Sequence, residues 1–396
     1  MAPSHLPSVS FRAALSWLAA VFLVSCGNPA GSDDAPSPHH PFSYTIVTDA
    51  LEIPWQMAFA PDGRIFISER NGLIRIVEND QLRSEPWLDL RDSVSTAAGV
   101  PVTNSGVTGI TLDPDFGTNR YVYIGYSYDD PDSGFDLNRL VRYTDDPKTQ
   151  TPVFDRVLLE GIKGLSMHNT AQIRFGPDGM LYWSVSERHV PEVAQDLSDP
   201  GGSLLRMTRD AEIPADNPIP GSYIYAYGLR NTQGFDWHPE TAVMLGTDHG
   251  PSGPQGCCHD EVNHIEAGKN YGWPIIRGNE TAEGMEAPLI HSGVGEPRDD
   301  YTWAPSGAAF LHNGPWYGSF LFAGLRSQSL WRLTINQSPE GSVEEDELSR
   351  HLQGVFGRIR AVEQHKNGDI YIITSNLDQH DVPFNTDMLI KLRLNE

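Results

Sequence analysis

The sequence predicts an all-β fold, a six-bladed β-propeller built from four-stranded antiparallel sheets. Two observations lead to this prediction. The 396-residue chain contains 37 glycines and 30 prolines, which favour many short strands joined by turns over long helices. In addition, six segments share one pattern, an apolar strand, a turn and a returning strand rich in aromatic and β-branched residues. Such a repeat is typical of sheets arranged radially around an axis.

The repeated unit can be followed along the chain in order. Its clearest copies are residues 57–69, 109–127 and 171–187, and its weaker copies are residues 234–250, 307–325 and 360–376. By subtraction, the turns are 53, 63, 62, 74 and 54 residues apart; they fall at Pro61, Pro114, Pro177, Pro239, Asn313 and Asn367. Six units predict six blades, whereas a sandwich without repeats would need six similar hairpins by coincidence.

The N-terminal segment is expected to direct export and to lie outside the fold. Residues 1–26 contain an apolar run too short to span a membrane as a stable helix, and they end in Leu23-Val24-Ser25-Cys26. This ending resembles the bacterial lipobox, so Cys26 is the predicted lipidation site; a plain secretory signal is the alternative. Residues 27–41 are expected to form a flexible linker, and residues 42–396 the propeller domain. We therefore expect an exported, periplasmic protein that reaches the membrane only through a lipid anchor.

The charge balance restricts the partners. The chain has 28 basic and 52 acidic residues, a formal net charge of −24. Such a surface repels nucleic acids and anionic membranes and is compatible with divalent cations, so we expect no nucleic-acid partner. A solvated acidic surface suited to a salty medium is the simpler interpretation of the charge.

The repeat also indicates a site at one end of the central channel. The position nine residues before the turn is His168, Arg230 or Arg358 in three units and Ser105, beside Asn104, in a fourth. Arg360 follows at alternate spacing, and Asn231 directly follows Arg230. The planar guanidinium group suits carboxylates and phosphates, so this rim is predicted to bind a multiply anionic ligand beside a histidine. The alternative is that the arginines pair with acidic side chains across the channel.

Several stretches resemble the soluble, pyrroloquinoline-quinone (PQQ)-dependent glucose and aldose sugar dehydrogenases, which are six-bladed propellers. The resemblance spans about residues 43–395, and its most specific motifs are YGLRNTQGFDWHP and DEVNHIEAGKNYGWP; others are GVTGITLDPDF, HNTAQIRFGPDGMLY, GSLLRMTRDAEIPADNP, GRIRAV and GDIYIITS. It implies PQQ and calcium as cofactors, an aldose as substrate and a periplasmic electron acceptor as partner. The implied reaction is oxidation of the sugar C1 hydroxyl to a lactone by hydride transfer to the quinone.

The resemblance also implies roles for individual residues. His168 matches the general base, and Arg230 and Asn231 match the pair that contacts the quinone oxygens, which makes His168 and Arg230 the expected catalytic residues. Arg358 and Arg360 match the pair that holds the cofactor carboxylates. The remaining implied positions are Asn104 and Arg326 for the cofactor, Gly250 and Pro251 for calcium through their carbonyls, and Glu261 and Tyr271 for a further calcium ion.

Three departures from the family pattern concern the surroundings of this site. Asn104 stands where a glutamine is usual, Arg326 where the glucose enzymes have a lysine, and Met167 where they have an aspartate. The long insertions that shape the glucose pocket in some relatives are also absent between residues 274 and 303. We therefore expect an open sugar site of low selectivity.

The stretch GPSGPQGCCHDEVNH contains the adjacent cysteines Cys257 and Cys258 in a lengthened loop. Soft thiolates and a hard calcium ion do not share ligands well, so a transition-metal site is not expected here. A vicinal disulfide bordering the cofactor is the hypothesis, with two free thiols as the alternative. Two further functions remain open: a calcium-dependent lactonase-like hydrolase, and a non-catalytic propeller that binds glycans or proteins.

Overall fold

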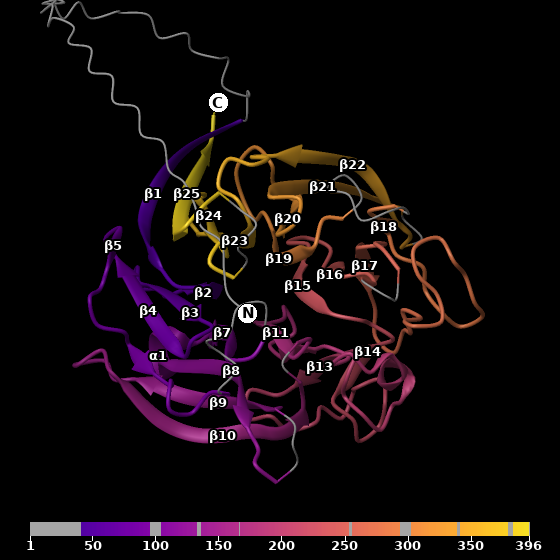
Figure 1. Ribbon diagram of the computed structural model, residues 1–396, viewed down its shortest axis with the longest axis horizontal. Helices are drawn as coiled ribbons and strands as arrows, with labels where there is room; N and C mark the ends of the chain where they lie inside the picture. Colours follow the sequence, from indigo (N-terminus) through magenta and orange to yellow (C-terminus); the bar gives the residue numbers. More distant parts are fainter. Residues whose placement is uncertain are drawn as a thin grey trace, which may run out of the picture. The chain divides into compact units, whose positions relative to one another are not determined.

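The computed structural model describes residues 41–95, 104–132, 136–165, 167–252, 256–293, 302–338, 341–378 and 383–395. Residues 40–396 form one compact unit in which six antiparallel sheets are arranged in a ring (Figure 1). The predicted six-bladed β-propeller is therefore confirmed. The helical elements in the described ranges are two short ones, α1 (Phe116–Asn119) and a 3₁₀ turn (Pro191–Gln195).

The sheets are named blades 1 to 6 in chain order. Blade 1 contains β2 (Pro54–Phe59), β3 (Ile65–Glu69), β4 (Leu73–Glu78) and β5 (Gln81–Leu82), and a fifth short strand, β6 (Leu88–Asp89), also pairs with β4. Blade 2 contains β7 (Val107–Leu112), β8 (Tyr121–Asp129), β9 (Asp136–Asp145) and β10 (Pro152–Lys163). Blade 3 contains β11 (Thr170–Phe175), β12 (Leu181–Val185), β13 (Ser203–Met207) and β14 (Ile224–Tyr227).

The other three blades follow the same plan. Blade 4 contains β15 (Thr232–Trp237), β16 (Met244–Asp248), β17 (Glu261–Ile265) and β18 (Ile290–His291). Blade 5 contains β19 (Pro305–Phe310), β20 (Phe320–Gly324), β21 (Ser329–Gln337) and β22 (Val343–His351). Blade 6 contains β23 (Ile359–Gln364), β24 (Ile370–Thr374) and β25 (Asp387–Leu394), and its outer strand is β1 (Phe42–Leu51).

The ring is closed by the two ends of the propeller chain. The N-terminal strand β1 pairs antiparallel with the C-terminal strand β25, from Phe42 opposite Leu394 to Leu51 opposite Asp387. Phe42 is buried in the apolar cluster of blades 5 and 6, where its ring meets the edge of Trp316. Ring closure therefore depends on residues that are more than 330 positions apart in sequence.

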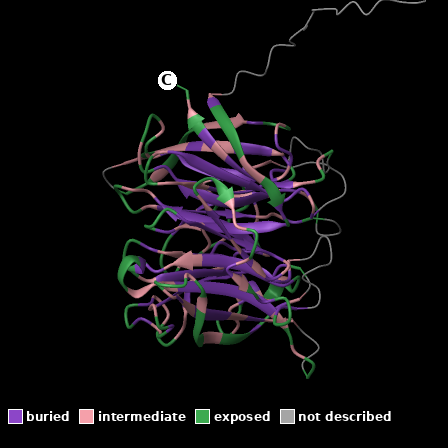
Figure 2. Ribbon diagram, turned by 90° about the vertical axis from the view of Figure 1, so that its left-hand side faces the viewer, coloured by how far each residue is buried: buried purple, intermediate pink, exposed green. Residues whose placement is uncertain are grey.

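Burial follows the position of each strand in its blade (Figure 2). The second strands of five blades are buried at every residue; they are β3, β12, β16, β20 and β24. Such strands pack against neighbouring blades on both faces, which explains apolar runs such as IYIIT in place of strict alternation. The outer strand β10 is largely exposed, and the residues of β22 are exposed or half-buried.

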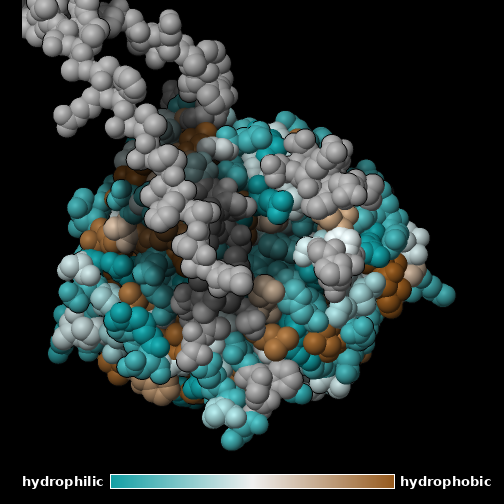
Figure 3. Space-filling view, in the orientation of Figure 1, coloured by the Kyte–Doolittle hydropathy of each residue, from teal (hydrophilic) through white to brown (hydrophobic). Residues whose placement is uncertain are grey.

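The innermost strands β2, β7, β11, β15, β19 and β23 contact one another in this order around the axis. The loops that precede them therefore converge at one end of the channel. The described surface in Figure 3 is mainly hydrophilic, with apolar residues in scattered groups, as the net charge of −24 leads one to expect. Within the described ranges, no helix has the length and apolar character needed to cross a membrane.

Candidate functional site

One cavity of about 240 Å³ lies at this end of the channel. Its walls combine residues from blades 3, 4 and 5: His168, Arg230, His249, Gly250, Pro251, Ser252, Cys257, Asp260, Thr302, Ala304 and Arg326. The fold thus brings together five residues that the sequence predicted for one site, namely His168, Arg230, Gly250, Pro251 and Arg326. His168 and Arg230 precede innermost strands, and the other three follow second strands, which finish at the same end of the channel.

The loop that carries His168 is held in an unfavourable backbone conformation. His168 has φ 55°, in the left-handed region that non-glycine residues rarely occupy, and Arg188 and His189 across from it have φ 47° and 58°. The His168 backbone N–H donates to Asn104 Oδ1 (3.1 Å), and its carbonyl accepts from Arg188 N–H (3.1 Å). Strained backbone held from both sides is typical of functional sites, where it fixes a side chain in one orientation.

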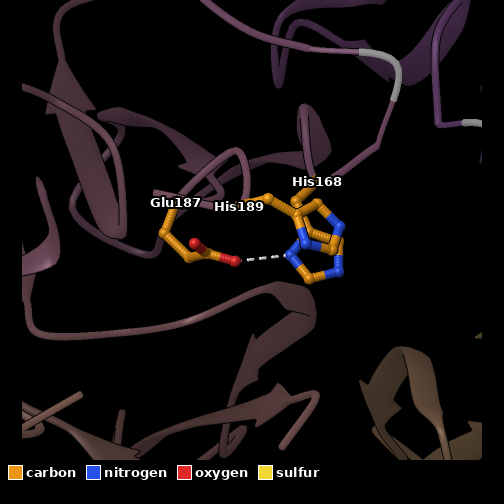
Figure 4. Close-up of side chains that lie close together, drawn as sticks. All are labelled: His168, Glu187 and His189. Atoms are coloured by element: carbon orange, nitrogen blue, oxygen red, sulfur yellow. Dashed lines mark hydrogen bonds and ion pairs between the residues drawn. The ribbon is translucent and has the colours of Figure 1, made fainter. Parts of the chain in front are cut away.

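The imidazole ring of His168 is oriented by two neighbours (Figure 4). Its Nδ1 lies 2.6 Å from Glu187 Oε1, and the ring of His189 stacks on it with 3.9 Å between centroids. Burial, with contributions from the charges of Arg230 and His189, lowers the pKa of His168 well below 6.5, so the ring is neutral at neutral pH. A neutral ring whose Nδ1–H donates to a carboxylate presents a basic Nε2, as a general base requires.

Glu187 is the carboxylate that positions this base. It is fully buried at the end of blade 3, and its Oε2 has no hydrogen-bond partner among the described residues. Burial raises the pKa of Glu187, and the positive charge of Arg230 acts against this rise. We interpret the pair as a histidine base with an orienting carboxylate.

The cluster of His168, Glu187 and His189 also has the composition of a transition-metal site. One ligand atom from each lies within 4.8 Å of the others. However, the two rings are stacked, with an angle of 25° between their planes, so their nitrogen lone pairs do not converge on one point. His168 Nδ1 is already hydrogen-bonded, and the cation Arg230 acts on all three residues. The geometry fits an acid–base pair better than a metal centre.

Arg230 and Arg360 have unused hydrogen-bond donors in the interior. Arg230 is 2% exposed and donates from Nη1 to the His249 carbonyl (3.1 Å), but its Nε and Nη2 are buried without partners in the described part of the chain. Arg360 is 2% exposed, lies 3.7 Å from the centroid of Trp55 and donates to Gln233 and Ser306, while its Nε is unpaired there. Burial lowers the pKa of Arg360 to about 9, which leaves it charged at neutral pH.

These arginines do not form the cross-channel pairs that were the alternative. Within the described ranges, no ion pair within 4.0 Å involves Arg230 or Arg360, whereas the nearby Arg70 pairs with Asp378 at 2.6 Å. Buried guanidinium groups with unused N–H donors cost free energy unless an acceptor fills the site. The donor set therefore fits an anionic ligand with several oxygens.

The other residues predicted to contact the cofactor are Asn231, Arg358, Arg326 and Asn104. Asn231 accepts from Ser186 and Gln233 through its Oδ1, and no hydrogen bond of its Nδ2 is found among the described residues. Arg358 donates from Nε to the Ser375 carbonyl (3.2 Å), and Arg326 is exposed at the cavity wall. Asn104 uses its Oδ1 on the backbone of His168, as described above. The roles of these residues toward a cofactor stay predictions.

The segment with Gly250 and Pro251 is held firmly, and its carbonyls are available. A Cβ added to Gly250 would lie 1.7 Å from the Cys258 carbonyl oxygen, so only glycine fits. Gly250 N–H donates to Asp260 (3.0 Å), whose other oxygen accepts from Thr302, Trp303 and Ala304. No described residue donates a hydrogen bond to the carbonyl of Gly250 or Pro251. Two free carbonyls suit a hard cation such as calcium.

Glu261 and Tyr271 lie outside the cavity wall. Glu261 accepts from Gly278 N–H (2.9 Å), and burial together with the neighbouring charge of Asp248 raises its pKa to about 8. The hydroxyl of Tyr271 bonds to His264 and Glu266, and no described hydrogen bond joins Tyr271 to Glu261. The second calcium site stays a prediction.

The cysteines of the lengthened loop are paired. Cys257 and Cys258 form a disulfide, and Cys257 contributes to the cavity wall. The predicted vicinal disulfide is thus present in this structure, at the cavity wall. The predicted lipidation site, Cys26, lies outside the described residues.

Sequence reasoning missed three residues of the site: Glu187, His189 and His249. The first two belong to the polar run SERH, which directly follows the second strand of blade 3, and His249 directly follows β16 of blade 4. Their position in the sequence could have identified them. Polar residues at the end of a buried second strand lie at the same end of the channel as the predicted rim.

Fold and site together define a six-bladed propeller with a histidine–carboxylate pair near buried arginines that keep unpaired N–H donors among the described residues. Comparison with known proteins agrees. The family model for glucose/sorbosone dehydrogenases matches residues 51–382, and the chain belongs to this family.

Several members of the family are similar over most of their length. The aldose sugar dehydrogenase of Escherichia coli K12 is 28% identical over 348 residues, which cover 83% of this chain and 89% of that protein. The PQQ-bound aldose sugar dehydrogenase of Streptomyces coelicolor is 28% identical with a TM-score of 0.73, covering 89% of this chain and 98% of that one. The apo form of the soluble E. coli enzyme superimposes with a TM-score of 0.71 at 25% identity, covering 89% and 100%.

Proposed function

We propose that this protein is a PQQ- and calcium-dependent dehydrogenase that oxidises the C1 hydroxyl of aldose sugars to lactones. The family and the PQQ-bound structural relative support sugar dehydrogenase chemistry with this quinone. The observation that carries the proposal is the presence, in one cavity, of a neutral buried histidine and of Arg230, whose Nε and Nη2 have no acceptor among the described residues.

The side chains divide the chemistry as follows. His168 Nε2 takes the proton of the anomeric hydroxyl, while Glu187 holds Nδ1–H and stabilises the imidazolium that forms. The quinone, when bound, supplies the hydride acceptor that the protein side chains lack. Arg230 and Asn231 would contact the quinone oxygens, where positive charge stabilises developing negative charge. Arg358 and Arg360 would hold the carboxylates of the cofactor, and Arg326 is exposed at the cavity wall.

Calcium is proposed at the carbonyls of Gly250 and Pro251. They fit a hard cation because they are oxygen donors without other described partners. There the ion would balance cofactor carboxylates and polarise the quinone as a Lewis acid. A further ion at Glu261 and Tyr271 is proposed from the resemblance alone.

Reconstitution tests the proposal directly. Purified apoprotein is titrated with PQQ and calcium, and dye reduction is followed with a panel of aldoses. We expect bound-cofactor absorbance and sugar-dependent dye reduction, both lost after chelation of calcium. Absence of both in the loaded protein would contradict the dehydrogenase proposal. Lactone hydrolysis would then favour a lactonase-like hydrolase, and glycan binding without turnover a non-catalytic propeller.

We further propose that the protein is exported, attached to the membrane through lipid on Cys26, and delivers electrons to a periplasmic acceptor. The support is the sequence of residues 1–26. Cys26→Ala is expected to move the protein from the membrane fraction to the soluble fraction. Unchanged membrane fractionation of this variant would refute the lipid anchor.

A further inference from the structure

The turn that follows β12 carries both side chains that hold the ring of His168. Glu187 bonds to Nδ1 of the ring, His189 stacks on its face, and Arg188 is the residue between them. Arg188 and His189 have φ 47° and 58°, so two consecutive residues lie in the left-handed region. Backbone of this kind persists only where the surrounding structure holds it in place. The contacts of Arg188 show what holds this turn.

Arg188 is fixed through its backbone and through its side chain. Its N–H donates to the His168 carbonyl (3.1 Å), which joins the turn to the loop of the base. Its guanidinium group makes two bonds to the carboxylate of Asp199, from Nη1 to Oδ1 (2.8 Å) and from Nη2 to Oδ2 (2.6 Å). Arg188 is 6% exposed, so this ion pair is largely shielded from water. Two parallel bonds between planar groups fix orientation as well as distance.

The loop that carries Asp199 is itself joined to the segment of Arg230. Further along this loop, the carbonyl of Gly202 accepts from the N–H of Leu229 (3.0 Å), the residue directly before Arg230. On the other side, the N–H of Glu187 donates to the Arg230 carbonyl (3.0 Å). The ion pair therefore connects the turn beside the base to the same backbone that places the arginine of the cavity.

We propose that Arg188 and Asp199 are positioning residues of the site, whose ion pair holds the turn after β12 so that Glu187 and His189 fix the ring of His168. Neither residue lines the cavity, so the pair acts on a substrate only through the base. The inference rests on the proposed function, in which His168 is that base. Without the pair, the turn can relax toward ordinary backbone angles, and the carboxylate of Glu187 moves away from Nδ1.

The test changes the pair from either side. Asp199→Asn keeps the size of the side chain and one acceptor oxygen but removes the charge, and Arg188→Lys keeps the charge but not the planar fork. Asp196→Asn is the matched control, because Asp196 is an exposed aspartate of the same loop that accepts from the N–H and hydroxyl of Ser198. Thermal unfolding checks that each purified variant is folded.

Two properties are then measured for each variant. Proton NMR of the apoprotein detects the Nδ1–H of His168, whose bond to Glu187 moves its resonance to low field; loss of this resonance in His168→Ala identifies it. Stopped-flow reduction of bound PQQ by an aldose gives the rate of the chemical step, and PQQ titration with calcium gives Kd. The first measurement needs neither cofactor nor substrate.

We expect Asp199→Asn to lose or shift the low-field resonance and to lower the reduction rate by about 10–10²-fold at a nearly unchanged Kd, since a small misplacement of a catalytic group has effects of this size. Asp196→Asn should match the wild type. A wild-type resonance and rate in folded Asp199→Asn would overturn the inference, and Arg188→Lys is judged by the same criterion if Asp199→Asn does not fold.

Two further outcomes are distinguishable from these. A raised Kd for PQQ at an unchanged resonance would place the ion pair in cofactor binding and would also overturn the inference. Failure of the wild-type protein to bind PQQ or to oxidise aldoses would overturn the proposed function, while the NMR comparison would still decide whether the pair positions the ring of His168.

Discussion

At the scale of single residues, the environment of His168 decides its chemistry. A free histidine has a pKa near 6.5, but burial and the charge of Arg230 keep this ring neutral, and Glu187 fixes which nitrogen is basic. The sequence identified His168 and the arginines. It did not identify Glu187, which is 19 residues further along and meets the ring only in the folded chain.

Removal of the base is expected to separate catalysis from binding. His168→Ala should lower kcat by about 10²–10⁴-fold, since a positioned base contributes this much, and leave the Kd for PQQ nearly unchanged. Glu187→Gln should also lower kcat, because an amide stabilises the imidazolium less well than a carboxylate. Stopped-flow reduction and PQQ titration measure the two effects. A large loss of PQQ affinity in His168→Ala would show that this residue binds cofactor rather than substrate.

The pH dependence follows from the lowered pKa of His168. Because the folded pKa lies well below 6.5, the ring stays neutral as the pH falls from 8 to 6.5, and kcat/KM should stay flat over this range and decline only at lower pH. Arg230→Gln removes a positive charge, so the acid limb should move to higher pH even though the absolute rate falls. A wild-type profile that already declines around pH 6.5 would contradict the assigned environment of the base.

At the scale of elements, three blades hold the rim by a bond between a residue before the innermost strand and a residue at the end of the second strand. In blade 3 the ring of His168 is bonded to Glu187. In blades 4 and 6 the backbone N–H groups of Arg230 and Arg358 donate to the side chains of Asp248 and Asn376. The partners are 19, 18 and 18 residues apart. The sequence repeat predicted the first member of each pair, and the second follows from hairpin geometry.

Asp260 performs a related task between blades 4 and 5. Its buried carboxylate accepts from Gly250, Thr302, Trp303 and Ala304, and so holds the segment with the proposed calcium carbonyls. Asp260→Ala would leave three backbone N–H groups without an acceptor, and we expect a loss of about 2–4 kcal/mol in the free energy of unfolding, together with weaker calcium binding.

Urea unfolding and calcium titration measure these losses. Asp146→Ala is the matched control, because that carboxylate also accepts from backbone N–H groups but in an exposed turn; a smaller loss of stability is expected there. Equal losses in the two variants would contradict the role assigned to Asp260.

At the scale of the whole molecule, the ring is closed by one pairing, that of β1 with β25. Each of the other five blades is built from strands that are consecutive in the chain, whereas blade 6 takes its outer strand from the start of the propeller. The stability of the closed ring therefore depends on how well β1 is anchored. Phe42 is the buried aromatic residue of that strand.

Phe42→Ala is expected to lower the free energy of unfolding by about 3–5 kcal/mol, the usual cost of removing a buried phenylalanine ring. Ile46→Ala in the same strand, where the side chain is 47% exposed, should cost less than about 1 kcal/mol. Denaturant unfolding measures both. Equal costs for the two variants would show that β1 is not anchored through Phe42.

The sequence by itself determined the six-bladed fold and most of the rim. Turn residues, apolar strands and their spacing are local properties, and a repeat multiplies each local signal, so β-propeller, blade number and the positions of His168, Arg230 and Arg358 could all be predicted. The resemblance to a known family added the chemical roles that are expected of these residues.

Only the tertiary structure decided which groups are satisfied and which are not. It showed that Glu187 bonds to the ring of His168, that Arg230 and His249 have buried atoms without hydrogen-bond partners in the described part of the chain, and that β1 completes blade 6. The physical reason is that burial and hydrogen-bond partners depend on contacts between residues far apart in the chain, and such contacts exist only after the blades have packed.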